Sequence, residues 1–318
     1  MIKTAAVELL SAPPIWPLLR KRALRNHSLT VLCFHTIGPD SGGVDGWTVL
    51  RENDFRTQLA AIKRYYEIVS LDEGIQTDPS SAKPRAVITF DDGDVGLYTH
   101  LLPILRKTPV PVTIYVATAQ IENNRPFWFD RVVNALQQPC EIHVEGLGRW
   151  VVPEAEGKIR WQVLEAILQA LKETPADRRD ALADQVAEKG GPPPVPALGP
   201  MTREQLAKLA ATPCVTIGAH SHGHELLDQV PLEQATESIC RSRNLLREWT
   251  GRDVSHFAFP NGNHSTALRS AVKELGFATA AILQERPVPR GNDPFAIPRI
   301  SIGRYDSLAR MKLRLVGL

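Results

Sequence analysis

The sequence predicts an α/β fold in which seven or eight parallel strands alternate with helices and close into a (β/α) barrel. Short apolar runs rich in β-branched residues recur along the chain, and amphipathic helical patterns separate most of them. Runs of this kind are typical of strands buried on both faces. Because about 250 residues take part in the alternation, a barrel is favoured over a doubly wound sheet, which gives the same local pattern.

Eight segments are predicted as strands because each is apolar over its length and ends in a polar or glycine-containing cluster. In chain order they are Leu29–His35, Tyr66–Leu71, Arg85–Phe90, Val110–Ala117, Cys214–Ala219, Ser255–Phe259, Ala278–Leu283 and Phe295–Ile302. Helical stripes between them begin at Phe55, Leu97, Leu232 and Leu268. Thr202 and Gln205 form a capping-box pattern, which predicts a further helix through Ala211.

One stretch interrupts the alternation and is interpreted as a helical insertion on a barrel loop, residues 139–200. It contains a polar strand-like piece, Glu141–Val152, then two helical patterns, Ile159–Lys172 and Asp177–Lys189. A proline-rich linker, Gly190–Pro196, follows them. The barrel is therefore expected to comprise residues 29–138 and 201–318, after an N-terminal helical segment of residues 1–28.

The N-terminal segment could pack on the domain or rest on a membrane surface. Its apolar stretch is broken by Glu8 and the Pro13-Pro14 pair, so neither a secretory signal nor a membrane span is predicted. Ile15–Leu19 is followed by Arg20–Arg22, a pattern that suits an anionic membrane surface. Packing on the domain is the favoured interpretation. We expect a cytoplasmic protein, with peripheral contact to the inner membrane face as the alternative.

Composition excludes several other classes. Lys and Arg number 37 and Asp and Glu number 35, so the formal charge of +2 argues against a nucleic-acid-binding protein. The four cysteines, among them Cys33, show no CxxC spacing and are interpreted as ordinary thiols, neither a metal cluster nor a disulfide framework.

Two motifs at strand ends carry the candidate chemistry. Asp91 and Asp92 follow the strand Arg85–Phe90, where barrel enzymes place their catalytic groups, although Asp-Asp-Gly is also a plain turn sequence. His220, His222 and His224 follow the strand Cys214–Ala219.

Imidazoles are common zinc ligands, and two of these histidines are expected to converge. His220 and His224 meet if a helix follows the strand, whereas His220 and His222 share a face if the strand continues; the first pair is favoured. Two imidazoles and one carboxylate form a three-ligand set with an open position for water. The second carboxylate is free to take a proton. A metal-bound water beside such a base is suited to hydrolysing an amide or ester.

These motifs resemble the first two motifs of the NodB-type polysaccharide deacetylases, carbohydrate esterase family 4. Thr89–Gly93 is similar to the first, and His220-Ser221-x-x-His224 to the second. The resemblance covers most of residues 29–302 and implies a distorted (β/α) barrel, a divalent metal (usually zinc) and removal of acetyl groups from sugars. The insertion accounts for the wide spacing of the two motifs.

The resemblance implies a role for each matching residue. Asp91 resembles the general base, and Asp92, His220 and His224 resemble the metal ligands. Ser221 matches a small hydroxyl residue of the histidine loop.

The third motif is represented by Ala258-Phe259-Pro260-Asn261-Gly262, in which Asn261 offers a backbone N–H to the oxyanion and Pro260 matches the family residue. Ala258 replaces an arginine that pairs with the base, and Arg299 is the candidate replacement. The C-terminal histidine of the family is missing, but His35 is similar to the acid histidine of permuted members.

The substrate-binding residues are predicted to be Trp128, Asp130, Pro260 and Arg299. Aromatic side chains can stack on sugar faces, although aromatic residues near a helix start, such as Phe127, Trp128 and Phe129, are as often part of a core.

The expected activity is removal of acetyl groups from N-acetylated sugars of a polysaccharide or glycan precursor. The alternatives are a lipid-linked or small cytoplasmic glycan intermediate as the substrate, and a noncatalytic carbohydrate-binding relative.

Overall fold

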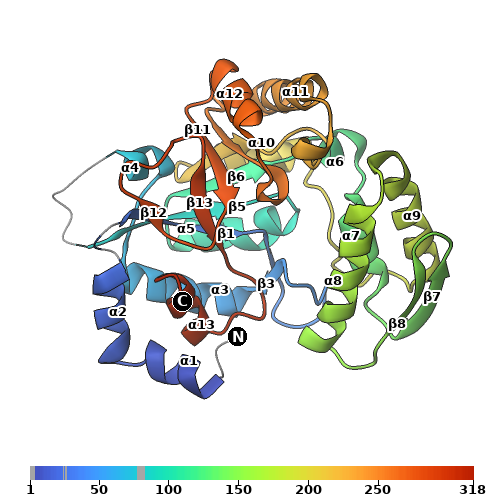
Figure 1. Cartoon of the computed structure of the whole chain (residues 1–318), viewed down its shortest axis with the longest axis horizontal. Helices are drawn as coiled ribbons and strands as arrows, with labels where there is room; N and C mark the ends of the chain where they lie inside the picture. Colours follow the sequence, from blue (N-terminus) through green and yellow to red (C-terminus); the bar gives the residue numbers. More distant parts are fainter. Residues whose placement is uncertain (1–3, 24, 26, 77–82) are drawn as a thin grey trace.

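The computed structural model describes residues 4–23, 25, 27–76 and 83–318, and its centre is a closed barrel of parallel strands. Each barrel strand pairs with the next in the list below, and β1 pairs with both β5 and β13, which closes the ring. In order around the barrel the strands are β1 (His27–Phe34), β5 (Arg85–Phe90), β6 (Val112–Val116), β9 (Val215–Ala219), β10 (His256–Ala258), β11 (Thr279–Leu283) and β13 (Ile297–Ser301). The predicted (β/α) barrel is confirmed, with seven strands (Figure 1).

One of the eight predicted strands, Tyr66–Leu71, does not join the barrel. It contributes only a two-residue strand, β4 (Glu67–Ile68), which pairs with the first two residues of β5, Arg85 and Ala86. A second short strand, β12 (Val288–Pro289), runs antiparallel to β1. Further from the barrel axis, β2 (Thr36–Gly38) and β3 (Val49–Arg51) form a separate parallel pair.

Burial explains why the barrel strands are continuous apolar runs. All six residues of β5 and all five of β6 are buried, because one face points into the barrel and the other packs under helices. The helices around the barrel are α3 (Glu52–Tyr65), α4 (Leu71–Ile75), α5 (Leu102–Lys107), α6 (Ala119–Asn123), α10 (Arg203–Ala210), α11 (Leu232–Thr250), α12 (Thr266–Glu274) and α13 (Leu308–Arg314). Shorter turns lie at η2 (Leu97–Leu101), η3 (Leu227–Gln229) and η4 (Pro260–Gly262). The predicted capping box is present, since the Thr202 side chain accepts from Gln205 N and the Gln205 side chain accepts from Thr202 N.

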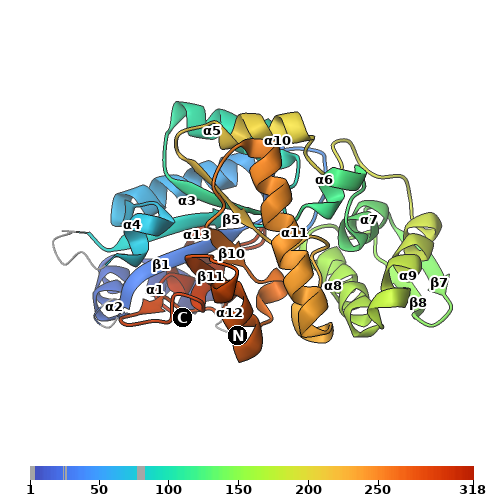
Figure 2. The same cartoon turned by 90° about the horizontal axis from the view of Figure 1, so that it is seen from above.

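A second hydrophobic core lies beside the barrel. It is built from α7 (Trp128–Ala135), β7 (Cys140–Val144), β8 (Gly148–Val152), α8 (Lys158–Glu173) and α9 (Ala176–Lys189). Figure 2 shows these elements gathered on one side of the barrel. The expected single strand over Glu141–Val152 is wrong, because the chain turns back after Val144 and forms the antiparallel β7–β8 hairpin.

The N-terminal residues form two short helices, α1 (Thr4–Ser11) and α2 (Ile15–Ala23), and α1 packs against α13 at the other end of the chain. The Trp16 side chain is 1% exposed, and its Nε1 donates to the Lys312 carbonyl at 2.8 Å. This contact fixes α2 to the domain, whereas Leu18 remains 66% exposed. Within the part of the chain that the structure describes, no helix is both long and apolar enough to cross a bilayer.

Candidate active site

The candidate residues lie at the carboxyl ends of four barrel strands. His35 follows β1, Asp91 and Asp92 follow β5, His220 follows β9, and the turn η4 follows β10. Parallel strands of a barrel all present their carboxyl ends at one rim, so residues far apart in sequence meet there.

Asp92, His220 and His224 form a candidate metal-binding group. The distances to Asp92 Oδ1 are 3.2 Å from His224 Nε2 and 3.6 Å from His220 Nε2, and the three ligand atoms lie within 4.8 Å of one another. Asp92 Oδ1 is buried without a hydrogen-bond partner among the described residues, which is costly unless a cation binds there. Two imidazoles and one carboxylate therefore fit a divalent metal.

Local backbone geometry brings these ligands together. Asp92 has φ of 73° and is followed by Gly93 at 88°, a tight left-handed turn that an aspartate tolerates. Ser221 and His224 are also left-handed, with φ of 60° and 55°. His220 and His224 are the pair that converges, but the predicted reason was wrong: a loop with two left-handed residues brings them together, and no helix follows β9 directly.

The environment of His220 prepares it to bind a metal through Nε2. Its Nδ1 lies 2.7 Å from the Ala258 carbonyl oxygen, which can only accept, so Nδ1 carries the proton. Burial lowers the pKa of His220 to about 4, and the imidazole is therefore neutral at neutral pH. Ala258 thus contributes through its backbone where the family motif has an arginine.

His222 faces away from this group. Its Nδ1 lies 2.8 Å from Thr118 Oγ1, and its Nε2 lies 3.5 Å from Glu122 Oε2. The pKa of His222 is lowered, first by burial and then by the charge of Arg241. The alternative pair of His220 and His222 is therefore not the one that the structure brings together.

Glu225 holds the histidine loop and was not singled out from the sequence. Its carboxylate accepts from Ser221 Oγ at 2.8 Å, from Ser238 Oγ at 2.8 and 2.9 Å, and from Gly223 N at 3.1 Å. Ser238 lies on α11, so Glu225 ties the loop to a helix. The acidic residue directly after the histidine motif was the only sequence signal for this role.

Asp91 is paired with Arg299, as the sequence suggested for the missing arginine. Arg299 Nη1 and Nη2 donate to Asp91 Oδ1 and Oδ2 at 2.6 and 2.7 Å. Burial alone would raise the pKa of Asp91, but the charges of Arg299 and His220 and the hydrogen bonds from Arg299 together outweigh it, so the pKa lies below its usual value. Arg299 is 0% exposed, so it cannot contact a sugar, and its predicted substrate-binding role is replaced by this pairing.

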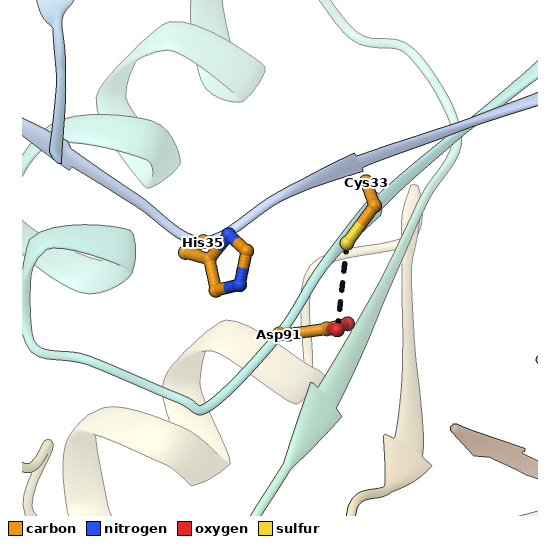
Figure 3. Close-up of side chains that lie close together, drawn as sticks. All are labelled: Cys33, His35 and Asp91. Atoms are coloured by element: carbon orange, nitrogen blue, oxygen red, sulfur yellow. Dashed lines mark hydrogen bonds between the residues drawn. The ribbon is translucent and has the colours of Figure 1, made fainter. Parts of the chain in front are cut away.

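Cys33 and His35 approach Asp91 from β1 and the residue beyond it (Figure 3). The Cys33 thiol donates to Asp91 Oδ2 at 3.4 Å, and the ligand atoms of all three residues lie within 4.8 Å of one another. A second metal is poorly suited to this place, because Arg299 already occupies both Asp91 oxygens and burial raises the pKa of the Cys33 thiol. We therefore assign no metal to this group, and Asp91 stays paired with Arg299.

One ring nitrogen of His35, the buried Nδ1, has no hydrogen-bond partner among the described residues. Its ring lies 5.7 Å from the Trp47 ring, in an edge-to-face arrangement. A histidine close to Asp91 with an unpaired ring nitrogen suits an acid that acts on bound substrate.

The third-motif loop forms the turn η4 near the metal group. Pro260 is buried, and Asn261 is exposed with φ of 56°. Gly262 also has a positive φ, and a Cβ there would lie 2.6 Å from Leu283 N, so only glycine fits. The first N–H groups of such a turn have no acceptor within it.

Two aromatic residues at the start of α7 pack on the metal group. Phe127 and Phe129 lie 5.6 and 5.0 Å from the His224 ring. The Trp128 ring lies beneath the Arg179 guanidinium, at 5.8 Å. Asp130 is 9% exposed, and its pKa is raised well above the usual value, mainly by burial and then by the charges of Asp92 and Asp94. Sugar binding by Trp128 and Asp130 stays a prediction.

Comparison with known proteins gives a family for this chain and several solved structures of the same fold. The family model for polysaccharide deacetylase matches residues 78–280. The Streptococcus pyogenes deacetylase PplD in complex with acetate superposes with a TM-score of 0.60 at 15% identity, over 91% of this chain and 99% of that chain. IcaB from Ammonifex degensii superposes with a TM-score of 0.59 at 18% identity, over 91% and 97%. A de-N-acetylase from Aggregatibacter actinomycetemcomitans gives 0.56 at 14% identity, over 90% and 99%. No curated protein sequence matches.

Proposed function

Because the chain belongs to the polysaccharide deacetylase family, we propose that it is a metal-dependent hydrolase that removes acetyl groups from N-acetylated sugars. The observation that carries the proposal is the placement of the candidate metal group, Asp92, His220 and His224, beside an aspartate paired with arginine. A metal site and an ionised carboxylate together are what hydrolysis of an amide requires.

Asp92, His220 and His224 would hold a divalent cation, for which we propose zinc. Bound there, it would polarise the acetyl carbonyl and acidify a water. Neutral His220 and ionised Asp92 suit this role, because burial keeps the first uncharged and the interaction with His224 lowers the pKa of the second against the effect of burial.

The remaining residues would move protons and hold charge. Asp91, kept ionised by Arg299, takes the proton of the attacking water. The Asn261 N–H donates to the oxyanion that forms on the acetyl carbonyl oxygen. His35 in its protonated form gives a proton to the sugar nitrogen as the C–N bond breaks, so the products are acetate and the free amine.

A noncatalytic carbohydrate-binding role was motivated by Ala258 and by the lack of a C-terminal histidine. The pairing of Asp91 with Arg299 and the position of His35 near Asp91 both favour an enzyme. The substrate is proposed to be a polysaccharide or a glycan precursor, including a lipid-linked or small intermediate. Mass spectrometry of glycan precursors in a deletion strain would distinguish a polysaccharide substrate from a lipid-linked or small precursor.

The direct test is acetate release from a chromogenic acetyl ester and from an N-acetylated chito-oligosaccharide. We expect turnover by the metal-loaded protein, loss of turnover with a chelator, and recovery when zinc is returned. Undiminished turnover in protein shown by elemental analysis to be free of metal would disprove the metal-dependent mechanism. Binding of the oligosaccharide with no acetate release would favour the carbohydrate-binding role.

A further inference from the structure

The side chain of Lys172, in the insertion, contacts the third-motif loop. Lys172 lies near the end of α8, and its Nζ donates to Asn261 Oδ1 at 2.8 Å. This acceptor is an uncharged amide oxygen, and none of the described residues forms an ion pair with Lys172. The ammonium is thus a partly buried positive charge without a fixed counter-charge.

The position of Lys172 is set by Arg179, which is 6% exposed. Arg179 Nε donates to the Leu171 carbonyl at 2.9 Å, and its Nη2 donates to the carbonyls of Lys172 and Thr174 at 3.0 Å each. These carbonyls lie at the C-terminal end of α8 or directly beyond it, where the helix has few N–H donors left for them; the Leu171 carbonyl also accepts from Thr174 N. The backbone that carries Lys172 is therefore held in place before any substrate binds.

Asn261 is held from its other side as well. Its Nδ2 donates to Asn263 Oδ1 at 2.8 Å, and Asn263 Nδ2 donates to the Asp228 carboxylate at 2.9 and 3.0 Å. A hydrogen-bonded chain thus joins α8, the third-motif loop and the turn η3. It places the Lys172 ammonium next to the residue whose backbone N–H is proposed to meet the oxyanion.

Asp92 of the candidate metal group is one of the charges that act on Lys172. Burial lowers the pKa of Lys172, the Arg179 charge lowers it further, and the charges of Glu165 and Asp92 raise it. Asp92 belongs to the candidate metal group, so Lys172 and that group act on each other electrostatically. An ammonium has three N–H groups, and Asn261 Oδ1 takes one of them.

We propose that Lys172 stabilises the oxyanion formed when water adds to the acetyl carbonyl, acting beside the Asn261 N–H. Donors aimed at a charge that develops only in the transition state contribute to kcat more than to binding. An unpaired, partly desolvated cation meets this description, because it acquires a counter-charge only during the reaction. This inference rests on the proposed deacetylase activity.

The test compares Lys172→Met and Lys172→Gln with wild type, all loaded with zinc, on an uncharged N-acetylated chito-oligosaccharide. Both variants should lower kcat by about 10²-fold, with KM within about twofold, because a single oxyanion donor contributes on this scale. Lys158→Met is the matched control, since Lys158 is exposed at the opposite end of α8, and it should leave kcat unchanged. Zinc content and thermal unfolding should match wild type in all three.

A second measurement separates charge stabilisation from a structural role. A glucosamine phosphonamidate, with an anionic tetrahedral phosphorus in place of the acetyl carbon, mimics the oxyanion. Its affinity should fall in Lys172→Met by about the same factor as kcat/KM. If Lys172→Met is too unstable to assay, Lys172→Gln can still donate to Asn261 without carrying a charge, and it should show the same losses.

Several outcomes would overturn the inference. Full kcat in Lys172→Gln would mean that the charge is not used, and a raised KM with unchanged kcat would mean that Lys172 binds ground-state substrate. A loss confined to oligosaccharides that carry carboxylate or phosphate would assign Lys172 to a fixed anionic group of the substrate. If wild type releases no acetate, the proposed function itself fails, which is a distinct result.

Discussion

Arg299 and Asp91 are 208 residues apart in the sequence and form a bidentate ion pair inside the barrel. The Arg299 side chain is 0% exposed and that of Asp91 is 3% exposed. Arg299 Nη1 also donates to Thr89 Oγ1 at 3.2 Å, and its guanidinium lies 5.2 Å from the centre of the Tyr115 ring. The partner of the candidate base is therefore fixed by packing as well as by charge.

Replacing Arg299 with Met should destabilise the fold, because it leaves the Asp91 carboxylate buried and unpaired. Breaking one side of such a pair costs about 3–5 kcal/mol. The free energy of unfolding, measured by urea denaturation at neutral pH, should fall by this amount. The double variant Arg299→Met with Asp91→Asn should recover part of the loss, since no unpaired charge remains.

The matched control is Arg269→Met, which breaks the surface pair of Arg269 with Asp293. Exposed pairs contribute less than about 1 kcal/mol, so unfolding should change little. Equal losses in Arg299→Met and in the double variant would show that lost packing, and not the unpaired carboxylate, causes the destabilisation.

Replacing Asp91 with Asn should abolish proton transfer while leaving the metal in place. The amide keeps the size of the side chain but cannot take a proton, so kcat should fall by about 10²–10⁴. Metal content, measured by elemental analysis, should stay at the wild-type level because Asp92 provides the ligand. Full turnover in this variant would mean that another group is the base.

Histidine substitutions should distinguish the two metal ligands of the histidine loop from His222, which lies between them in sequence and is not a ligand. His220→Ala and His224→Ala each remove a ligand atom from the candidate group, so bound metal and activity should be lost together. His222→Ala is the control, because His222 contacts Thr118 and Glu122 instead. Retention of stoichiometric metal in both His220→Ala and His224→Ala would place the metal elsewhere.

The barrel could be predicted because its strands are buried on both faces and so are continuous apolar runs. The two exceptions have different causes. Tyr66–Leu71 is apolar enough for a strand, but its end begins α4 and only Glu67–Ile68 pairs, with the first two residues of β5. The hairpin over Glu141–Val152 was missed although its turn contains Gly146 and is followed by Gly148, both with positive φ, and these glycines were the available turn signal.

The site could be predicted where its residues are adjacent in the sequence, as at Asp91 and Asp92. Residues that act through tertiary contact gave little signal unless the family resemblance pointed to them, as it did for Arg299. Lys172 looks like the end of an amphipathic helix, and nothing in the sequence places it against Asn261, 89 positions away. The convergence of His220 and His224 depends on left-handed backbone at Ser221 and His224, which side-chain periodicity does not reveal.

Glu225→Ala should weaken metal binding although Glu225 is not a ligand. Its carboxylate holds Ser221, Gly223 and Ser238, and loss of such support typically lowers metal affinity by about 10–100-fold. Competition with a fluorescent zinc chelator would measure the change. Glu233→Ala, an exposed acidic residue of α11, is the control and should bind zinc as wild type does. Unchanged affinity in Glu225→Ala would show that the loop holds its shape without this carboxylate.

Asp130 makes the stability of the protein depend on pH in a direction opposite to that of most acidic residues. Its pKa in the folded state is raised well above the usual value of 3.8, first by burial and then by Asp92 and Asp94. Metal on Asp92 would reduce the second effect but not the first. Below the unfolded pKa both states hold the proton, and the residue has no effect on the free energy of unfolding.

As the pH rises above that value, the unfolded chain releases the proton while the folded chain keeps it, so folding becomes less favourable until the folded pKa is passed. Asp130→Asn removes this ionisation. Calorimetry of zinc-loaded protein between pH 4 and pH 7 would measure the effect. The variant should have a higher Tm than wild type at pH 7, and the difference in Tm should shrink towards zero near pH 4. A lower Tm for the variant at pH 7 would mean that the ionised carboxylate is stabilised in the fold, contrary to its burial.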